Sequence, residues 1–365
     1  MSKVLIFSDL HLHRHKDRID RLQDCIKVLD WIFEVAEIHN CDDIWFLGDL
    51  FHERNKIDMM DYITAFEAIV KHMTDDAHNR ELYLLVGNHD MYHKEKWSVN
   101  SVRPFSTIPG VTIIQSPVSL QMGKVKIDWM PHTENPVRDL ATFKKAGAGN
   151  ILLGHMSVHG ALTNMFYGTR SDVIVEYDND MIPVDSSIFE DWDMTFLGHY
   201  HGAQKLSDKV EYVGSPLELS FGEAFQQKHV IVLDLDTMEK EYVVNDFSPK
   251  HLIITPQDVQ DENYNLNGNF IRIAVEDMGR KDLVDLKRQI AQKYDTLSLD
   301  MKEKDKSKVE EQDANAIEDI KQVLANIDDM LKRYIKEVDV PEKCDADHML
   351  KIGLKCLEPL EKELE

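Results

Sequence analysis

Five short polar clusters contain side chains that can bind metal ions, and each cluster directly follows an apolar run. They lie at residues 9–11 (DLH), 48–49 (GD), 87–90 (GNHD), 154–155 (GH) and 198–201 (GHYH). A strand that ends in such a loop positions ligands on a rigid scaffold. Together the clusters can hold two hard or borderline cations close together, which is the equipment for hydrolysing a phosphate ester.

The spacing within the clusters indicates which side chains act together. Asp9 and His11 lie two residues apart on an extended segment and therefore point to the same side. His199 and His201 have the same relation, so one loop again supplies two ligands. Asp49 follows the second strand, and we expect its carboxylate to bridge two cations.

Asn88 and His155 complete the predicted ligand set. Mixed Asp, His and Asn ligation favours Mn²⁺, Fe or Zn²⁺ over Ca²⁺. We expect His89 to contact phosphate and to protonate the leaving oxygen, and Asp90 to hydrogen-bond His89 and fix its tautomer. The expected mechanism is in-line attack of a metal-activated hydroxide on phosphorus.

Chance must be weighed, because the chain has 17 histidines and a lone DxH or GH pair is a weak signal. Five clusters in order, each after a strand, are far more specific. The histidines predicted to be surface or filler residues are His13, His15, His39, His72, His78, His93 and His159.

Alternating strands and helices are expected to position the clusters. Apolar residues at spacings of three and four predict helices over 21–39 and 58–73, between strands over 4–7, 44–47 and 82–86. This order implies parallel strands with helices packed outside. Further strands are expected at 111–114, 118–122, 124–130, 150–153, 194–197, 210–214, 229–234 and 239–244, with part of a helix at 143–148. The predicted fold is an α/β two-layer or sandwich-type domain with mixed sheets.

A change in composition near residue 248 predicts a domain boundary, so the first domain covers 1–248. Strands at 251–255 and 269–275 and a helix at 280–294 predict a small α/β module over 249–298. Residues 299–365 are interpreted as a linker, polar from 300 to 315, followed by C-terminal helices with a heptad pattern. These helices either pack on each other as a hairpin or bind a partner.

The formal net charge of -24 argues against simple electrostatic binding of nucleic acid. A polyanionic substrate would need local basic patches, bound metals or a partner. No run approaches the ~18 apolar residues of a membrane span. The four cysteines lack a CxxC spacing, and the N-terminus is too short for a signal peptide, which together favour a cytoplasmic location, in the host if the source is viral.

With all five clusters present, residues 1–245 resemble the calcineurin-like metallophosphoesterase superfamily. Two further segments, GDLFH at 48–52 and VGSPLELSFGE at 213–223, resemble the nuclease subunits of SbcCD-type complexes, including phage counterparts. That resemblance implies a DNA exonuclease and endonuclease of recombination and repair that acts on duplex ends. It also implies two divalent ions, Mn²⁺ in the first place with Mg²⁺, Fe or Zn²⁺ as alternatives.

The resemblance also assigns residues. It implies that one ion is held by Asp9, His11, Asp49 and His201, and the other by Asp49, Asn88, His155 and His199. It makes His89 the transition-state residue and puts His52 near the scissile phosphate, where it would tune exonuclease action.

The same resemblance assigns partners. The 249–298 module would cap DNA, the C-terminal helices would dock on an SbcC-type coiled-coil ATPase, and helices of the first domain would form a homodimer.

Two other functions compete with the nuclease interpretation. The first is a small-molecule or phosphoprotein phosphatase on the same dinuclear site, which the acidic charge and the lack of an obvious basic groove would support. The second is a non-enzymatic scaffold with a degenerate site, which is disfavoured because no expected ligand is missing.

Overall fold

The computed structural model describes residues 2–14, 19–74, 80–93, 96–162, 184–276 and 278–303. The chain divides into two compact units between Lys302 and Glu303. The predicted C-terminal helices lie outside the described residues. Within the described part, no helix is both long and apolar enough to cross a bilayer.

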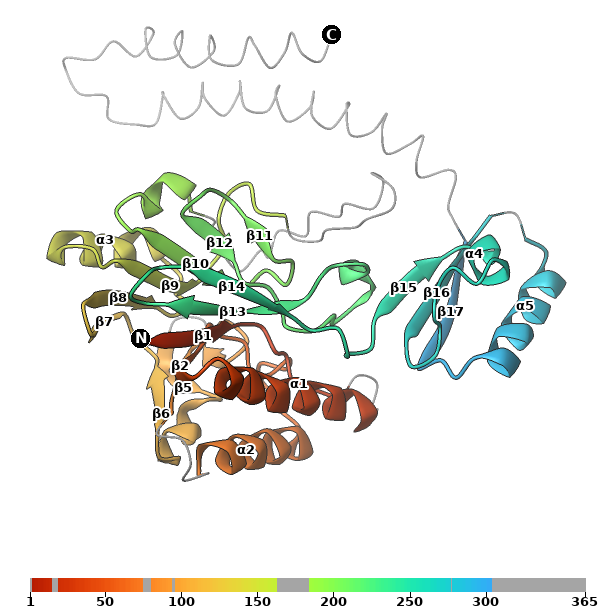
Figure 1. Ribbon diagram of the computed structural model, residues 1–365, viewed down its shortest axis with the longest axis horizontal. Helices are drawn as coiled ribbons and strands as arrows, with labels where there is room; N and C mark the ends of the chain where they lie inside the picture. The colour runs from red at the N-terminus through yellow and green to blue at the C-terminus, as the bar shows by residue number, and fades with distance from the viewer. Residues whose placement is uncertain are drawn as a thin grey trace, which may run out of the picture. The chain divides into compact units, whose positions relative to one another are not determined.

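The first sheet has six strands in the order β14-β13-β1-β2-β3-β6 (Figure 1). The four strands β1, β2, β3 and β6 run parallel, while β13 is antiparallel to β1 and β14 to β13. Their bounds are Lys3–Phe7 for β1, Cys41–Phe46 for β2, Glu81–Leu85 for β3, Val111–Ile114 for β6, His229–Asp234 for β13 and Lys240–Val244 for β14.

The second sheet also has six strands, in the order β11-β12-β10-β9-β8-β7. Its strands β8, β9, β10 and β12 are parallel, and antiparallel partners lie at both edges. The bounds are Val118–Met122 for β7, Val125–Met130 for β8, Ile151–His155 for β9, Met194–Gly198 for β10, Gln204–Lys205 for β11 and Val210–Tyr212 for β12.

The two sheets pack face to face and share a core. Side chains from both sheets form one buried cluster, in which the rings of Trp45 and Trp129 meet edge to face at 5.5 Å. Helices α1 (Ile19–Ile38) and α2 (Met59–Met73) cover the outer face of the first sheet (Figure 1). Helix α3 (Pro136–Ala146) packs on the outer face of the second sheet. The predicted sandwich with mixed sheets is confirmed.

Helix α3 begins earlier than the sequence pattern predicted, and its ends have clear local causes. The Asn135 side chain accepts a hydrogen bond from the Arg138 backbone N–H, and Pro136 occupies the first turn, where no N–H is needed. Gly147 follows the helix with a φ of 84°, so the helix ends before the predicted residue 148.

A hairpin of β4 (Met91–His93) and β5 (Lys96–Asn100) was not predicted at all. It follows directly from the fourth residue of the GNHD cluster. Short 3₁₀ turns complete the domain: η2 at Arg103–Thr107, η4 at Ser186–Phe189 and η5 at Phe221–Glu223.

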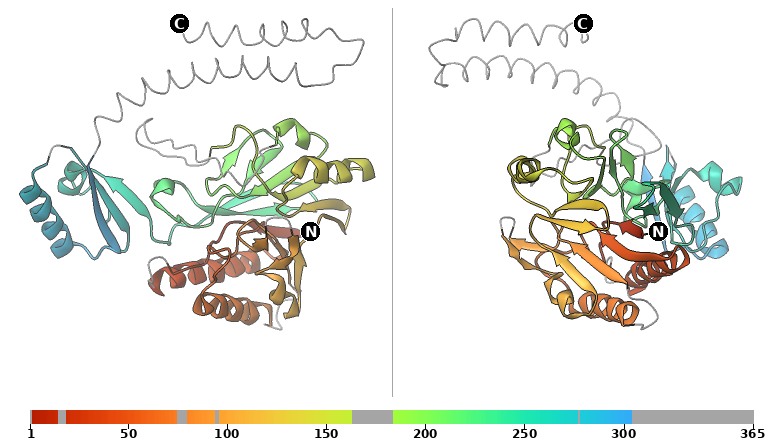
Figure 2. Two further views of the ribbon diagram at one scale, coloured as in Figure 1. Left: turned by 180° about the vertical axis from the view of Figure 1, so that it is seen from behind. Right: turned by 60° about the vertical axis from the view of Figure 1, so that its left-hand side comes forward.

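The segment after residue 250 forms a three-stranded sheet in the order β15-β16-β17, with its own core (Figure 2). Its elements are β15 (His251–Ile254), α4 (Pro256–Gln260), β16 (Phe270–Val275), α5 (Arg280–Lys293) and β17 (Ser298–Glu303). Strand β17 corrects the predicted boundary at 298, because residues 299–303 were interpreted as linker. Leu299 and Met301 alternate with charged residues and pack against this core, which is the period of a half-buried strand.

Candidate metal centre

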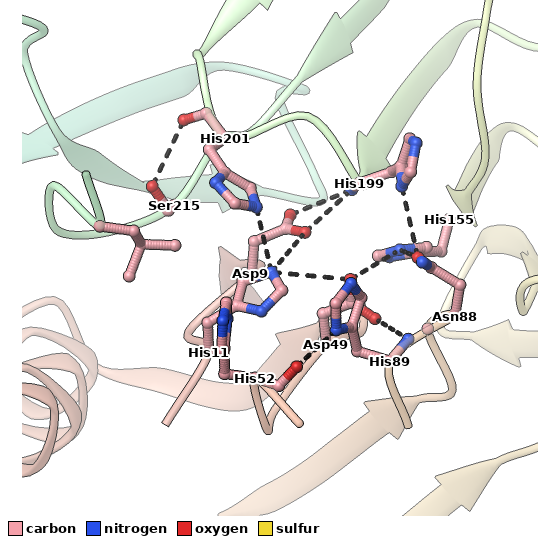
Figure 3. A network of polar contacts seen from close by, with 12 residues as sticks. Asp9, His11, Asp49, His52, Asn88, His89, His155, His199, His201 and Ser215 are labelled. Atoms are coloured by element: carbon pink, nitrogen blue, oxygen red, sulfur yellow. Dashed lines mark hydrogen bonds and ion pairs between the residues drawn. The ribbon is translucent and has the colours of Figure 1, made fainter. Parts of the chain in front are cut away.

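The predicted ligands meet where parallel strands of both sheets end (Figure 3). Because β1, β2 and β3 are parallel neighbours, the loops after them lie at one edge of the first sheet. The ends of β9 and β10 bring the two remaining clusters to the same place. Asp9, His11, Asp49, Asn88 and His155 are buried, and His199 and His201 are partly buried.

The backbone around these ligands is held in conformations that most residues avoid. The φ angles of Asp9, His11 and Asp49 are 52°, 46° and 63°, and that of His199 is 104°. Non-glycine residues with positive φ are uncommon and cluster at functional sites. Gly87 is required by close approach, because a Cβ there would lie 2.2 Å from Asp49 Oδ1.

Three groups of side chains bring their ligand atoms close enough to hold an ion: two consist of predicted ligands, and the third joins His89 to His11 and Asp49. In the first, Asp9, His11 and His201 bring one ligand atom each to within 4.8 Å of one another. In the second, Asp49, His155 and His199 do the same.

Asp49 lies between the two groups. Its Oδ2 is 3.6 Å from His11 Nε2 and 3.3 Å from His155 Nε2. The geometry matches that expected of a bridging carboxylate, and its bridging role stays a prediction.

The polar atoms of the site fit divalent cations. The Nε2 atoms of His11 and His201 face each other at 3.0 Å, so at most one of them can donate a proton to the other. The Asn88 Oδ1 is 2.8 Å from His155 Nε2 and 3.3 Å from His199 Nδ1. Imidazole nitrogens and an amide oxygen that converge in this way can also bind a cation.

The protonation states favour metal binding at most positions. Burial raises the pKa of Asp49, but His155, His89 and His11 outweigh it and hold the pKa well below its usual value. Burial, followed by the charge of His155, lowers the pKa of His199 to about 3. Ionised carboxylates and neutral imidazoles are the forms that bind metals.

His155 is one exception, because its pKa is raised, and we expect it to make metal binding dependent on pH. Burial lowers its pKa, but the carboxylates of Asp49 and Asp9 outweigh burial and raise the pKa to about 9 in the metal-free protein. A metal must therefore displace a proton at neutral pH. We expect the apparent metal affinity to rise up to about tenfold per pH unit toward pH 9 and then level off. Calorimetry in buffers of different ionisation enthalpy would measure the released proton, and pH-independent affinity between pH 6 and 8 would contradict this.

His89 lies beside both groups but has an unexpected orienting partner. Its backbone N–H donates to Asp49 Oδ1 at 2.8 Å, and its Nδ1 is 2.6 Å from the carbonyl oxygen of His52. This carbonyl, and not Asp90, is the group that can fix the tautomer of His89.

Asp90 instead links the Gly87 loop to the Asp49 loop through backbone hydrogen bonds. Its carboxylate accepts hydrogen bonds from the backbone N–H groups of Gly87, Asp49 and Leu50 at 2.9 to 3.0 Å. Burial and the nearby charge of Asp49 raise the pKa of Asp90 to about 6. Asp90 therefore shapes the site through the backbone, which corrects the expected contact with His89.

A row of imidazoles extends from the site. The ring of His52 stacks near that of His89, with centroids 6.0 Å apart and an interplanar angle of 26°. His13, which we predicted to be a surface or filler residue, also stacks on His52, with ring centroids 4.2 Å apart. Its HxH spacing after Asp9 was the signal that could have identified it.

Glu223 is a second residue that motif reasoning did not assign. Its Oε1 lies 3.0 Å from His201 Nδ1, opposite the nitrogen that faces the first group of ligands. The available signal was its position at the end of the quoted 213–223 segment.

Two packed mixed sheets with helices outside, and Asp, Asn and His ligands at the strand ends, define a metallophosphoesterase. The family model of the calcineurin-like phosphoesterases matches residues 2–203, so the chain belongs to this family. It is a metal-dependent phosphodiesterase, and therefore a hydrolase.

Individual relatives are similar over longer stretches. Exonuclease subunit 1 of Enterobacteria phage T4 is 21% identical over 302 residues, which cover 82% of this chain and 81% of that protein. The SbcD component of the SbcCD nuclease of Staphylococcus saprophyticus is 26% identical over 265 residues, 64% of this chain and 65% of its own length. Among solved structures, an archaeal phosphodiesterase aligns with 67% of this chain and 99% of its own, at 13% identity and a TM-score of 0.34.

Proposed function

We propose that this protein is a Mn²⁺-dependent DNA exonuclease and endonuclease that processes duplex ends in recombination and repair. One observation carries the choice of substrate: the match to the phage exonuclease subunit spans 302 residues, whereas the family model covers only residues 2–203. The similarity to a nuclease thus extends beyond the domain that all such phosphoesterases share.

Residues of this chain would hold two metal ions. When bound, two divalent ions would activate water and neutralise charge on the phosphate. Asp9, His11, Asp49 and His201 would hold one ion, and Asp49, Asn88, His155 and His199 the other.

Proton transfer would fall to His89. Donation from its Nδ1 to the His52 carbonyl would hold the ring in one orientation and leave Nε2 to carry the proton for the leaving oxygen. The His52 ring would lie near the scissile phosphate and favour exonuclease action, with His13 stacked behind it. Asp90 would keep the Gly87 and Asp49 loops at the correct separation.

The experiment that tests this proposal compares three substrates with Mn²⁺: linear duplex DNA, a generic aryl phosphodiester and an aryl phosphomonoester. Cleavage of DNA and of the diester is expected. Turnover of the monoester without DNA cleavage would contradict the nuclease and favour the phosphatase, which the net charge of -24 supports.

We also propose partners for this activity. Because the chain is acidic, DNA binding by the isolated chain should be weak and should strengthen with Mn²⁺ and with an SbcC-type ATPase. The β15–β17 module would cap the DNA, and the helices beyond residue 313 would dock on the ATPase. Copurification with a coiled-coil ATPase, followed by nuclease assays with and without ATP, tests the partnership.

A homodimer is proposed through helix α2. Met59, Met60 and Ile63 on this helix are 74%, 52% and 45% exposed, which is unusual for neighbouring large apolar side chains. We expect Ile63→Glu to shift the protein to a monomer in light scattering. Val284→Glu, at a 52% exposed apolar position on α5, is the matched control. An unchanged mass for Ile63→Glu would contradict an interface on this face.

A further inference from the structure

Glu223 is a buried carboxylate that contacts a predicted metal ligand from the side away from the metal. It is 3% exposed and lies in the 3₁₀ turn η5. Its Oε1 is 3.0 Å from Nδ1 of His201, whose Nε2 faces His11 Nε2 at 3.0 Å. The two nitrogens of one imidazole thus face a carboxylate on one side and the first ligand group on the other.

The second oxygen of Glu223 is fully engaged, which fixes the carboxylate. Oε2 accepts hydrogen bonds from Lys228 Nζ at 2.6 Å, from Ser215 Oγ at 3.0 Å and from the Leu219 N–H at 3.2 Å. Rotating the group toward another partner would break all three bonds. Oε1 is therefore directed at His201 by the other half of the same carboxylate.

The backbone of His201 is held by the same residues. Its carbonyl oxygen accepts from the Ser215 N–H at 3.0 Å and from Lys228 Nζ at 2.9 Å, and the Ser215 hydroxyl oxygen lies 3.4 Å from it (Figure 3). Lys228 is 5% exposed, so its charge is matched mainly by Glu223. Glu223 and Lys228 thus hold both ends of His201.

The segment that carries Glu223 is anchored at its middle as well. The Glu218 carboxylate accepts the backbone N–H of His251, the first residue of β15. The guanidinium of Arg272 lies 4.0 Å from the centre of the Phe221 ring. These contacts tie the segment to the β15–β17 module, so it does not move as a free loop.

We propose that Glu223 is a positioning residue for His201: it fixes the tautomer with the proton on Nδ1 and directs Nε2 toward the first ion. Lys228 holds Glu223 in place. A carboxylate behind a histidine ligand raises the basicity of the ligand and fixes its orientation. The inference rests on the ligand role of His201 within the proposed function, but it does not depend on DNA as the substrate.

The test is Mn²⁺ calorimetry on the full chain without any substrate. In Glu223→Gln, the affinity for one of the two Mn²⁺ ions is expected to fall about 10- to 100-fold. The affinity for the other ion should be unchanged. The matched control is Glu211→Gln, because Glu211 is also buried and accepts a hydrogen bond from a lysine, Lys240, at 2.8 Å. The Glu211 carboxylate bonds Lys240 and Tyr242, and neither is a predicted metal ligand. We expect the control to bind both ions with wild-type affinity.

A second variant separates positioning from folding. Glu223→Gln combined with Lys228→Gln removes both buried charges together, so it should unfold at a temperature closer to that of the wild type than Glu223→Gln alone. The ion that binds weakly to Glu223→Gln should also bind weakly to this double variant. Wild-type affinity for both ions in either folded variant would overturn the proposal. An equal loss of affinity for both ions would also overturn it. Because no substrate is present, a failed nuclease assay would not affect this result.

Discussion

Replacing His89 with alanine should reduce phosphodiester cleavage by about 10²- to 10⁴-fold while both metal ions stay bound. The reason is that the ring lies beside both ligand groups, yet its Nδ1 is engaged by the His52 carbonyl at 2.6 Å. The His89 contact that supports the metal centre is made by its backbone N–H to Asp49, and alanine keeps that bond. Loss of the ring therefore removes the proton donor without removing a support of the site.

The measurement is the rate on duplex DNA and on an aryl phosphodiester, together with the number of ions bound per chain. His159→Ala, at an exposed histidine outside the clusters, is the matched control and should have wild-type activity. A diester with a good leaving group needs less help from an acid, so its rate should fall less than that on DNA. If His89→Ala loses an ion, then His89 is a ligand and the role as acid is wrong.

Asp49→Asn should have the larger effect, with loss of tight binding of both ions and a fall in activity of about 10⁴-fold or more. Asp49 Oδ2 lies within 3.6 Å of a nitrogen from each ligand group, so an amide there would remove the charge that both ions share. Asparagine keeps an oxygen for the His89 N–H, which preserves the local backbone.

Metal content by mass spectrometry and calorimetry would measure this loss, with thermal unfolding as a check on the fold. Asp43→Asn is a close control because Asp43 lies in β2, the strand that leads into the Asp49 loop. Burial, with Asp42 and Glu81 nearby, raises the pKa of Asp43 to about 6, so its removal should not destabilise the protein at neutral pH. Retention of two tightly bound ions by Asp49→Asn would contradict a bridging role.

Much of the secondary structure was predictable because periodicity is a local property. The strand predicted at 229–234 is β13, and it pairs antiparallel with the next strand, β14. The predicted helix over 58–73 is α2 with Asp58 as its cap. The elements that were not predicted are the three-residue strand β4 and the start of α3 at Pro136. Their sequence patterns are too short or too weak for periodicity to reveal them.

The convergence of the candidate ligands was predictable for a related reason, and their role as ligands stays a prediction. Each cluster follows a strand, and parallel strands bring the loops at their carboxyl ends to one edge of a sheet. Order along the chain therefore implied proximity in space for Asp9, Asp49 and Asn88. The family match and the sandwich fold agree with this interpretation.

The hydrogen-bonding and stacking partners of these residues were not predictable, because they depend on which groups lie close together in the folded chain. Asp90 looked like the neighbour of His89 in sequence, but its carboxylate binds backbone groups 40 and 41 residues away. His13 looked like filler until folding placed its ring on His52. Glu223 reaches His201 across 22 residues.

The sequence by itself thus determined the sandwich of strands and helices and the residue types of the metal centre, because hydrophobic periodicity and strand-end motifs are local patterns. Only the tertiary structure decided which groups orient those residues. A hydrogen bond depends on distances of about 3 Å and on angle, and spacing along the chain does not set either across tens of residues. The carbonyl behind His89, the clamp at Asp90 and the carboxylate behind His201 all belong to this second class.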